Sequence, residues 1–243
     1  MSEIGYDLED GVAVVTLQAP QRRNALTVAM AEELVATLDR ADADESVGAV
    51  VIAGGASFCA GADLGVLGAA GADPAEDGNF RAIETIYRAF QRVGSLAVPA
   101  ICAVRGAAVG AGMNLMLAAD LRVVASDARL ISGFQRIGAH PGGGHLHLLH
   151  RVAGRETAAA MGLFGQRLDG AEAVRTGMAW AAVDDAEVEP LARRLAAVPA
   201  ADPALSRRTT ASFRRETSGA GMPWDVAVEV ERSAQMWSFR RRA

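Results

Sequence analysis

Hydrophobic and polar residues follow two patterns along this chain, one typical of strands and one typical of helices. Two short apolar runs, at residues 4–8 and 12–17, flank Asp10-Gly11, a dipeptide that suits the positive φ angles of a tight turn. The chain is therefore expected to open with a β-hairpin. Further short apolar runs predict buried strands at residues 47–53, 100–104, 121–125 and 128–131.

Apolar residues at helical spacing predict two long helices in the first half of the chain. Thr27 can cap the first helix, and residues 74–96 form the second, which Pro99 separates from the next strand. A glycine-rich loop at residues 106–112 then leads into a short helix at 113–119. Later helices are expected at residues 146–152, 156–163, 171–176, 188–198, 203–217 and 224–239. This order is typical of an α/β core followed by a C-terminal helical region.

The composition narrows the class of protein. With 243 residues and 51% hydrophobic composition, the chain can bury one full core, and nothing indicates two independent domains. The formal net charge of −5 comes from interspersed acids and bases, which argues against nucleic acid as a partner. No apolar run is long enough to span a membrane, the first residues lack the features of a signal peptide, and two cysteines give no disulfide framework. A cytoplasmic protein is the expectation.

Two glycine-containing segments each follow a predicted strand. The first reads Ser57-Phe-Cys-Ala-Gly-Ala-Asp-Leu64, and the second reads Arg105-Gly-Ala-Ala-Val-Gly-Ala-Gly-Met-Asn-Leu-Met-Leu-Ala-Ala-Asp120. In this order they resemble the signature loops of the crotonase, or enoyl-CoA hydratase/isomerase, superfamily, which acts on acyl-CoA thioesters. The resemblance runs from roughly residue 10 to residue 185 and is weak in the C-terminal helices.

The resemblance implies an α/β fold in which crotonase-like ββα units form a spiral. Residues 1–185 would form the acyl-CoA-binding core, and residues 186–243 a C-terminal helical region that takes part in trimer formation. A homotrimer or a dimer of trimers is expected on the same ground. Coenzyme A enters as the thioester substrate or ligand, so no separate metal or redox cofactor is implied.

A thioester carbonyl gains negative charge on oxygen when its α-carbon is deprotonated or its β-carbon is attacked, and fixed N–H donors stabilise that charge. Matched position by position, the resemblance assigns these donors to the backbone amides of Ala62 and Ala111. Gly110 and Gly112 would let the backbone approach a ligand closely. The Ala111 amide also precedes a predicted helix, whose dipole would favour an anion.

A third segment, Arg22-Arg-Asn-Ala-Leu26, resembles the first CoA-contacting segment of the family, where a basic side chain meets the nucleotide phosphates. The residues expected to contact the CoA thioester are Arg23, Ala25, Ala60, Ala62, Asp63, Leu64, Gly110 and Ala111. The basic tail Arg240-Arg-Arg242 could also reach a phosphate across a subunit boundary, although a frayed terminus is the simpler interpretation.

The two glutamates that transfer protons in the hydratases of this family are not matched in this chain. The first aligns with Asn114, whose amide can orient water but cannot take its proton, and the second aligns with Phe134, which offers only apolar surface. Ordinary enoyl-CoA hydration is therefore not expected. Isomerisation that relies on the second glutamate is not expected either.

Three interpretations remain. Other residues could carry proton transfer in a decarboxylase, hydrolase or similar enzyme, and His140 is the best-placed candidate because histidine titrates near neutrality. Alternatively, the protein could bind acyl-CoA without turnover, as a carrier or sensor in lipid metabolism, with Phe134 enlarging an apolar pocket. A purely structural subunit is the third interpretation, and the two glycine loops argue against it.

Two other features of the sequence could suggest different chemistry. No carboxylate or cysteine accompanies the histidines at a recognised metal-binding spacing, so packing or capping roles are expected for His140, His145, His147 and His150. Cys59 has no base nearby in the sequence, so packing is expected for it as well.

Overall fold

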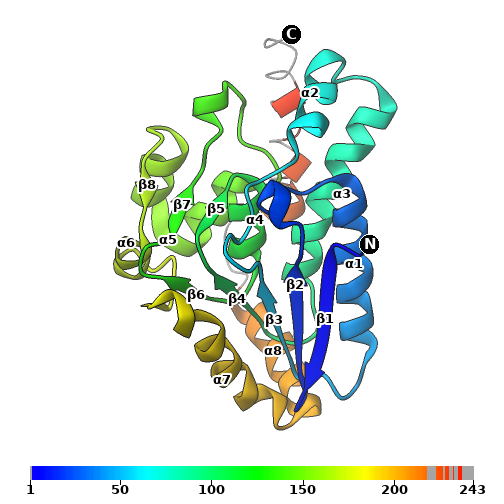
Figure 1. Ribbon diagram of the computed structural model, residues 1–243, viewed down its shortest axis with the longest axis vertical. Coiled ribbons are helices and arrows are strands. Elements are labelled where there is room, and N and C mark those ends of the chain that lie inside the picture. Colours follow the sequence, from blue (N-terminus) through cyan, green and yellow to red (C-terminus); the bar gives the residue numbers. More distant parts are fainter. Residues whose placement is uncertain (1, 218–222, 227, 230–231, 233–234, 237–243) are drawn as a thin grey trace.

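The structure is a computed structural model that describes residues 2–217, 223–226, 228–229, 232 and 235–236 (Figure 1). Its larger sheet has six strands in the order β1-β2-β3-β4-β6-β9. β1 (Ile4–Glu9) pairs antiparallel with β2, and every other pair in this sheet is parallel. The remaining strands are β2 (Val12–Leu17), β3 (Ala49–Ala53), β4 (Ala100–Val104), β6 (Leu121–Ala125) and β9 (Ala181–Val183).

A smaller sheet lies beside the first and has the order β5-β7-β8. β5 (Ala107–Val109) pairs parallel with β7 (Arg129–Ile131), which pairs antiparallel with β8 (Arg167–Leu168). The chain therefore passes from the larger sheet to the smaller one between the end of β4 and the start of β5. Helix α4 (Ala111–Ala118) follows β5 at once, so the second glycine loop lies where the two sheets meet.

The predicted hairpin is confirmed. Asp10 and Gly11 have φ angles of 49° and 77°, and they form a two-residue turn between Glu9 and Val12, which are paired in the sheet. β3 and β4 are buried at every position, because they are central parallel strands covered on both faces.

Helices cover the larger sheet. α1 (Val28–Ala43) packs against α3 (Asp77–Gly94), and α7 (Val188–Ala200) packs against β3, β4 and β6. Thr27 caps α1 as expected, since its hydroxyl oxygen accepts a hydrogen bond from the Met30 amide at 3.1 Å. The other helices of the described chain are α2 (Leu64–Ala72), α5 (His145–Gly162), α6 (Gly170–Arg175) and α8 (Pro203–Thr217).

The predicted α/β core followed by helices is confirmed, but several elements differ from the expectation. The helices expected at 146–152 and 156–163 form one element, α5, which breaks at Gly154 with φ 76° and ψ 173°. The sequence pattern gave no sign of α2, β5, β8 or β9. Half of the helix expected at 224–239 lies outside the described residues, and the tail Arg240-Arg-Arg242 lies entirely outside them.

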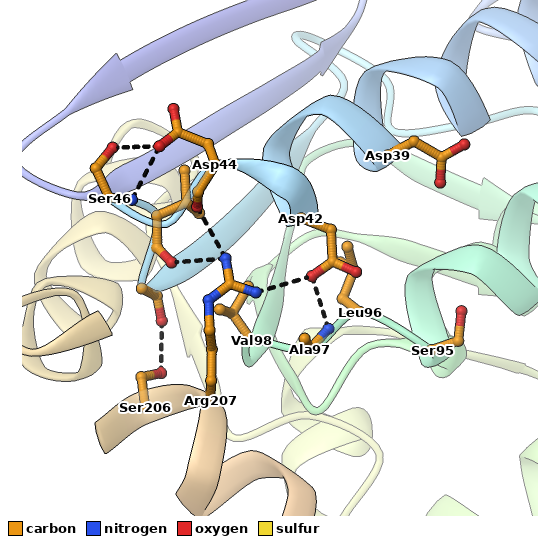
Figure 2. Close-up of polar contacts among 12 residues, drawn as sticks. Asp39, Asp42, Asp44, Ser46, Ser95, Leu96, Ala97, Val98, Ser206 and Arg207 are labelled. Carbon is orange, nitrogen blue, oxygen red and sulfur yellow. Dashed lines mark hydrogen bonds and ion pairs between the residues drawn. The ribbon is translucent and has the colours of Figure 1, made fainter. Parts of the chain in front are cut away.

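Helix α8 is attached to the segment that connects α1 and β3 (Figure 2). The Ser206 hydroxyl donates to the Gly48 carbonyl at 2.6 Å, and the Arg207 guanidinium donates to the Asp44 carbonyl at 2.9 Å. Asp42, at the end of α1, receives the Ala97 amide at 2.8 Å and also faces Arg207 at 3.5 Å. This helix of the C-terminal region therefore packs on the core of its own chain.

Candidate functional site

A cavity of about 140 Å³ opens between the two glycine loops, α3 and the start of α4. Its walls are mainly apolar, and the large apolar side chains among them are Leu64, Leu67, Ile83, Ile86, Phe90 and Phe134. Four residues with polar side chains also line the cavity: Tyr87, Asn114, Ser132 and Gln235. Among the described residues that line it, none carries a carboxylate.

Backbone hydrogen bonds hold the two glycine loops against each other. The Cys59 amide donates to the Ala107 carbonyl at 3.0 Å, and the Val109 amide donates back to the Cys59 carbonyl at 3.0 Å. Gly112 is required for this approach, because a Cβ atom at that position would lie 2.3 Å from the Cys59 carbonyl oxygen. The spacing between the loops is therefore set by main-chain contacts.

The amides of Ala62 and Ala111 lie on the cavity, one from each loop. Within the described part of the chain, neither N–H group donates a hydrogen bond to another protein group. A Cβ atom on Gly61 would lie 3.8 Å from the Ala111 nitrogen, so the two loops come together at this point. Gly110 precedes Ala111 with φ 52° and ψ −110°, a conformation that favours glycine, and it sets the direction of the first turn of α4.

Asn24 connects the first motif segment to the first glycine loop. Its backbone has a φ angle of 57°, and its buried amide group donates to the Gly54 carbonyl at 2.7 Å and to the Ser57 carbonyl at 2.8 Å. Its side-chain oxygen accepts from the Ala19 amide at 2.8 Å. The sequence reasoning quoted Asn24 only as part of a motif, whereas the structure gives it a supporting role for the loop that carries Ala62.

The two arginines of that segment have different surroundings. Arg22 forms a two-pronged ion pair with Glu3 and donates to the Ala25 carbonyl at 2.8 Å, so its guanidinium is already engaged. Arg23 is exposed, and its carbonyl accepts from the Ala60 amide at 2.9 Å. Of the two, Arg23 is the side chain available to a phosphate.

The remaining predicted contact residues occupy varied places. Ala60, Leu64 and Gly110 line the cavity, and Leu64 is 77% exposed at its edge. Asp63 caps α2 by accepting from the Gly65 amide at 2.9 Å. Ala25 lies just before the backbone bridge between Leu26 and Ala62.

His140, the predicted proton-transfer residue, is not among the described residues that line the cavity. Its Nδ1 atom lies 2.7 Å from the Pro141 carbonyl oxygen. The residue expected to replace the second glutamate, Phe134, does line the cavity, as does Asn114.

A chain of side-chain hydrogen bonds lies behind the cavity, and the sequence reasoning did not anticipate it. Asn114 Oδ1 is 2.7 Å from His145 Nδ1, and His145 Nε2 is 2.8 Å from the Ser132 hydroxyl oxygen. Asn114 also donates through Nδ2 to the Gly142 carbonyl at 2.9 Å. These residues come from α4, from the first turn of α5 and from the end of β7, so no local sequence spacing could have signalled their contact.

The imidazole of His145 is buried beside an aromatic ring. The side chain is fully buried, and its ring centre is 4.8 Å from that of Phe134. Burial lowers the pKa of His145 from 6.5 to about 3. The imidazole is therefore neutral at physiological pH.

Neither cysteine has the properties of a nucleophile. Cys59 and Cys102 are buried, and burial raises the pKa of each thiol to about 12. Both are thiols packed in the core at neutral pH, and thiolate chemistry is not available to either of them. Among the helices of the described chain, none is long and apolar enough to cross a membrane.

Comparisons with known proteins cover nearly the whole chain. A model of the enoyl-CoA hydratase/isomerase family matches residues 7–236. A probable enoyl-CoA hydratase, EchA14, from Mycobacterium tuberculosis is 44% identical over 211 residues, which are 86% of this chain and 80% of that protein. A 1,2-epoxyphenylacetyl-CoA isomerase from Escherichia coli is 33% identical over 239 residues, which are 96% of this chain and 88% of the isomerase.

Solved structures of enoyl-CoA hydratases and isomerases are also similar to this chain over nearly its whole length. An enoyl-CoA hydratase/isomerase from Xanthobacter autotrophicus superposes with a TM-score of 0.87 at 31% identity, covering 97% of this chain and 88% of the other. An enoyl-CoA hydratase from Mycobacterium avium superposes with a TM-score of 0.85 at 26% identity, covering 99% of this chain and 95% of the other. The similarity therefore includes the C-terminal region, where the motif resemblance is weak.

Proposed function

Because the chain belongs to the enoyl-CoA hydratase/isomerase family, we propose that it binds an acyl-CoA thioester whose carbonyl oxygen accepts hydrogen bonds from the amides of Ala62 and Ala111. One observation carries this proposal, namely that both amides lie on the same apolar cavity without a protein acceptor among the described residues. Two fixed N–H donors at that oxygen would stabilise the negative charge that develops during thioester chemistry.

We also propose that the protein is a poor enoyl-CoA hydratase. Adding water across a conjugated thioester needs groups that take and give protons near neutral pH. Asn114 and Phe134 cannot do so, and no described residue of the cavity wall supplies a carboxylate in their place. The activity is therefore either a different thioester reaction or, as the alternative, acyl-CoA binding without turnover in a carrier or sensor of lipid metabolism.

Several further properties follow from family membership and form part of the same proposal. The exposed Arg23 side chain would contact the CoA phosphates, and Ala25 and Ala60 would lie along the path of the CoA chain. No resident metal or redox cofactor is needed for this chemistry. We expect a homotrimer or a dimer of trimers in the cytoplasm.

The test of acyl-CoA binding removes one N–H donor without removing a side chain. Ala111 is the first residue of α4, a position where proline is well tolerated, so Ala111→Pro deletes the N–H group while the helix is retained. We expect acyl-CoA affinity, measured by isothermal titration, to fall at least about tenfold, in line with the loss of a buried charge-stabilising bond of about 1.4 kcal/mol or more.

Val28→Pro is the matched control, because Val28 is the first residue of α1 and does not line the cavity. It should bind acyl-CoA like the unchanged protein. Equal affinity of Ala111→Pro and the control, with both folded, would contradict the placement of the thioester carbonyl at this amide.

A second measurement tests the proposed lack of hydratase activity. A panel of short, medium and long 2-enoyl-CoAs is incubated with the protein, and loss of the conjugated thioester absorbance is followed. Turnover near the typical enzyme value of about 10 per second would contradict the proposal. Binding without loss of absorbance would support the proposed lack of hydratase activity. The bound thioester would then be tested for other reactions.

A further inference from the structure

The hydrogen bonds around His145 show which of its two ring nitrogens carries the proton. Asn114 donates through Nδ2 to the Gly142 carbonyl, which can only accept, so Asn114 Oδ1 is the atom that faces His145 Nδ1. That oxygen is also only an acceptor, and therefore Nδ1 carries the proton of the neutral imidazole. The lone pair of Nε2 then accepts the hydrogen bond from the Ser132 hydroxyl, 2.8 Å away.

Ser132 also belongs to the cavity wall and lies beside one of the proposed amide donors. The residue before it, Ile131, accepts a hydrogen bond from the Gly110 amide at 3.0 Å, and Gly110 directly precedes Ala111. The Ser132 carbonyl oxygen lies 3.6 Å from the position of a Cβ atom on Gly110. Ser132, whose hydroxyl proton is directed to His145, thus lines the same cavity as Ala62 and Ala111, whose amides have no protein acceptor among the described residues.

These parts together are the ones that acyl transfer requires: a hydroxyl nucleophile, a base bonded to it, a residue that orients the base, and donors for the oxyanion. We infer that Ser132 attacks the bound acyl-CoA thioester, with His145 as its base and Asn114 as the positioning residue, and that the thioester is hydrolysed through an acyl-serine intermediate. The inference rests on the acyl-CoA binding proposed above.

Each step of this reaction balances. The Ser132 oxygen bonds to the carbonyl carbon while its proton passes to His145 Nε2. The tetrahedral adduct collapses, the carbon–sulfur bond breaks, and the proton passes to the sulfur, so that CoA leaves as the thiol. Water then attacks the ester carbon and gives its proton to His145. The bond from that carbon to the Ser132 oxygen breaks, the proton returns to this oxygen, and the products are a carboxylic acid and the free enzyme.

The same geometry predicts a slow reaction. Asn114 holds the tautomer of His145 but brings no negative charge, and the apolar Phe134 ring packs against the imidazole. The imidazolium formed during attack would therefore be stabilised mainly by the nearby oxyanion. A slow reaction makes the acyl-serine easier to trap.

The experiment follows CoA release and the mass of the intact protein on the same samples. Acyl-CoAs of several chain lengths are added, CoA thiol is followed with a chromogenic thiol reagent, and aliquots are quenched with acid for mass spectrometry. We expect CoA release together with a mass increase equal to the acyl group minus one hydrogen, located on the peptide that contains Ser132. Ser132→Ala should lose the adduct and at least about 100-fold of the release rate, while binding acyl-CoA within about twofold of the unchanged protein.

Two further variants complete the test. Ser206→Ala is the matched control, because it also removes a buried hydroxyl. Ser206 lies on α8, away from the cavity, and its hydroxyl donates to one backbone carbonyl. It should release CoA like the unchanged protein. Ser132→Cys retains a nucleophile at the same position, and we expect it to form a thioester adduct at that residue even if Ser132→Ala folds poorly.

The outcomes separate this inference from the proposed function. Acyl-CoA binding with no adduct and no CoA release in the unchanged protein would overturn the acyl-serine mechanism while leaving the binding proposal in place. Equal CoA release by Ser132→Ala would also overturn it. Absence of binding, measured by titration, would overturn the proposed function itself.

Discussion

Among single residues, Asn114 is the one whose side chain faces the proposed base on the side away from Ser132. Its uncharged oxygen lies 2.7 Å from His145 Nδ1, and burial lowers the pKa of His145 to about 3. We expect Asn114→Asp, which places an anion at this position, to raise the pKa of His145 and to speed CoA release at least about tenfold. The variant would lose the bond to the Gly142 carbonyl, at a cost of about 1–3 kcal/mol in folding stability.

The double variant Asn114→Asp with Ser132→Ala is the control for this prediction. If the new carboxylate acts through His145 and Ser132, the double variant shows no gain in CoA release. A gain of the same size in both variants would mean that the carboxylate acts on the substrate directly, which contradicts the positioning role of Asn114.

His145 should also make folding stability depend on pH. Its pKa is lower in the folded protein than its ordinary value of 6.5, so protonation favours the unfolded chain. This contribution to stability is complete above pH 6.5 and is lost as the pH falls from 6.5 toward 3, with a slope approaching about 1.4 kcal/mol per pH unit. Urea unfolding at about pH 7, 5.5 and 4.5 should therefore show a smaller loss of stability for His145→Gln than for the unchanged protein. Equal slopes would contradict a buried, neutral His145.

At the scale of elements, the sequence predicts those parts whose pattern is local. The hairpin at Asp10-Gly11, the cap at Thr27 and the buried strands β3 and β4 all have a local chemical signal. β5, β8 and β9 are only two or three residues long and depend on pairing partners far along the chain. Helix α2 consists entirely of glycine, alanine, leucine and valine, and has no amphipathic pattern.

The residues of the candidate site also differ in whether the sequence alone could locate them. The amides of Ala62 and Ala111 could be located from the sequence, because glycine spacing in a loop is a local signal. The contact of Ser132 with His145 could not, since it joins the residue after β7 to the first residue of α5, 13 positions further along the chain. The sequence pointed to His140, because histidine titrates near neutrality and its loop flanks the acyl pocket in the family it resembles, but its Nδ1 atom lies 2.7 Å from the carbonyl oxygen of Pro141 in its own loop.

The pairing of the two glycine loops gives a prediction at the same scale. Gly112→Ala would place a Cβ atom 2.3 Å from the Cys59 carbonyl oxygen, and because that neighbour is backbone, the loops must move apart. The distance between the Ala62 and Ala111 amides would change, so we expect acyl-CoA affinity to fall at least about tenfold and the melting temperature to drop by several degrees.

Gly68→Ala in α2 is the matched control, because nothing lies within 4 Å of a Cβ atom added there. It should bind like the unchanged protein and melt at the same or a higher temperature. Titration and thermal unfolding of both variants test the prediction, and normal affinity of a folded Gly112→Ala would contradict the need for close loop pairing.

Over the whole molecule, the site lies where the chain crosses from the larger sheet to the smaller one. Both sheets and Asn24 fix the backbone of the two loops. Ala111 begins α4, which also carries Asn114, and the Gly110 amide bonds to Ile131, the residue before Ser132. The second amide donor and the side chains proposed to react are therefore held by the same part of the fold.

The surface of the molecule yields a last prediction, about assembly. Leu163 and Phe164 are adjacent at the end of α5, and their exposed fractions are 60% and 75%. Large neighbouring apolar side chains in water favour contact with another subunit. We expect a trimer or hexamer by size-exclusion chromatography with light scattering, and a shift toward monomer in the double variant Leu163→Asp with Phe164→Asp. Val198→Asp, at a single residue of α7 that is 77% exposed, should leave the assembly unchanged. A monomeric parent protein, or a double variant of unchanged mass, would contradict an interface at this end of α5.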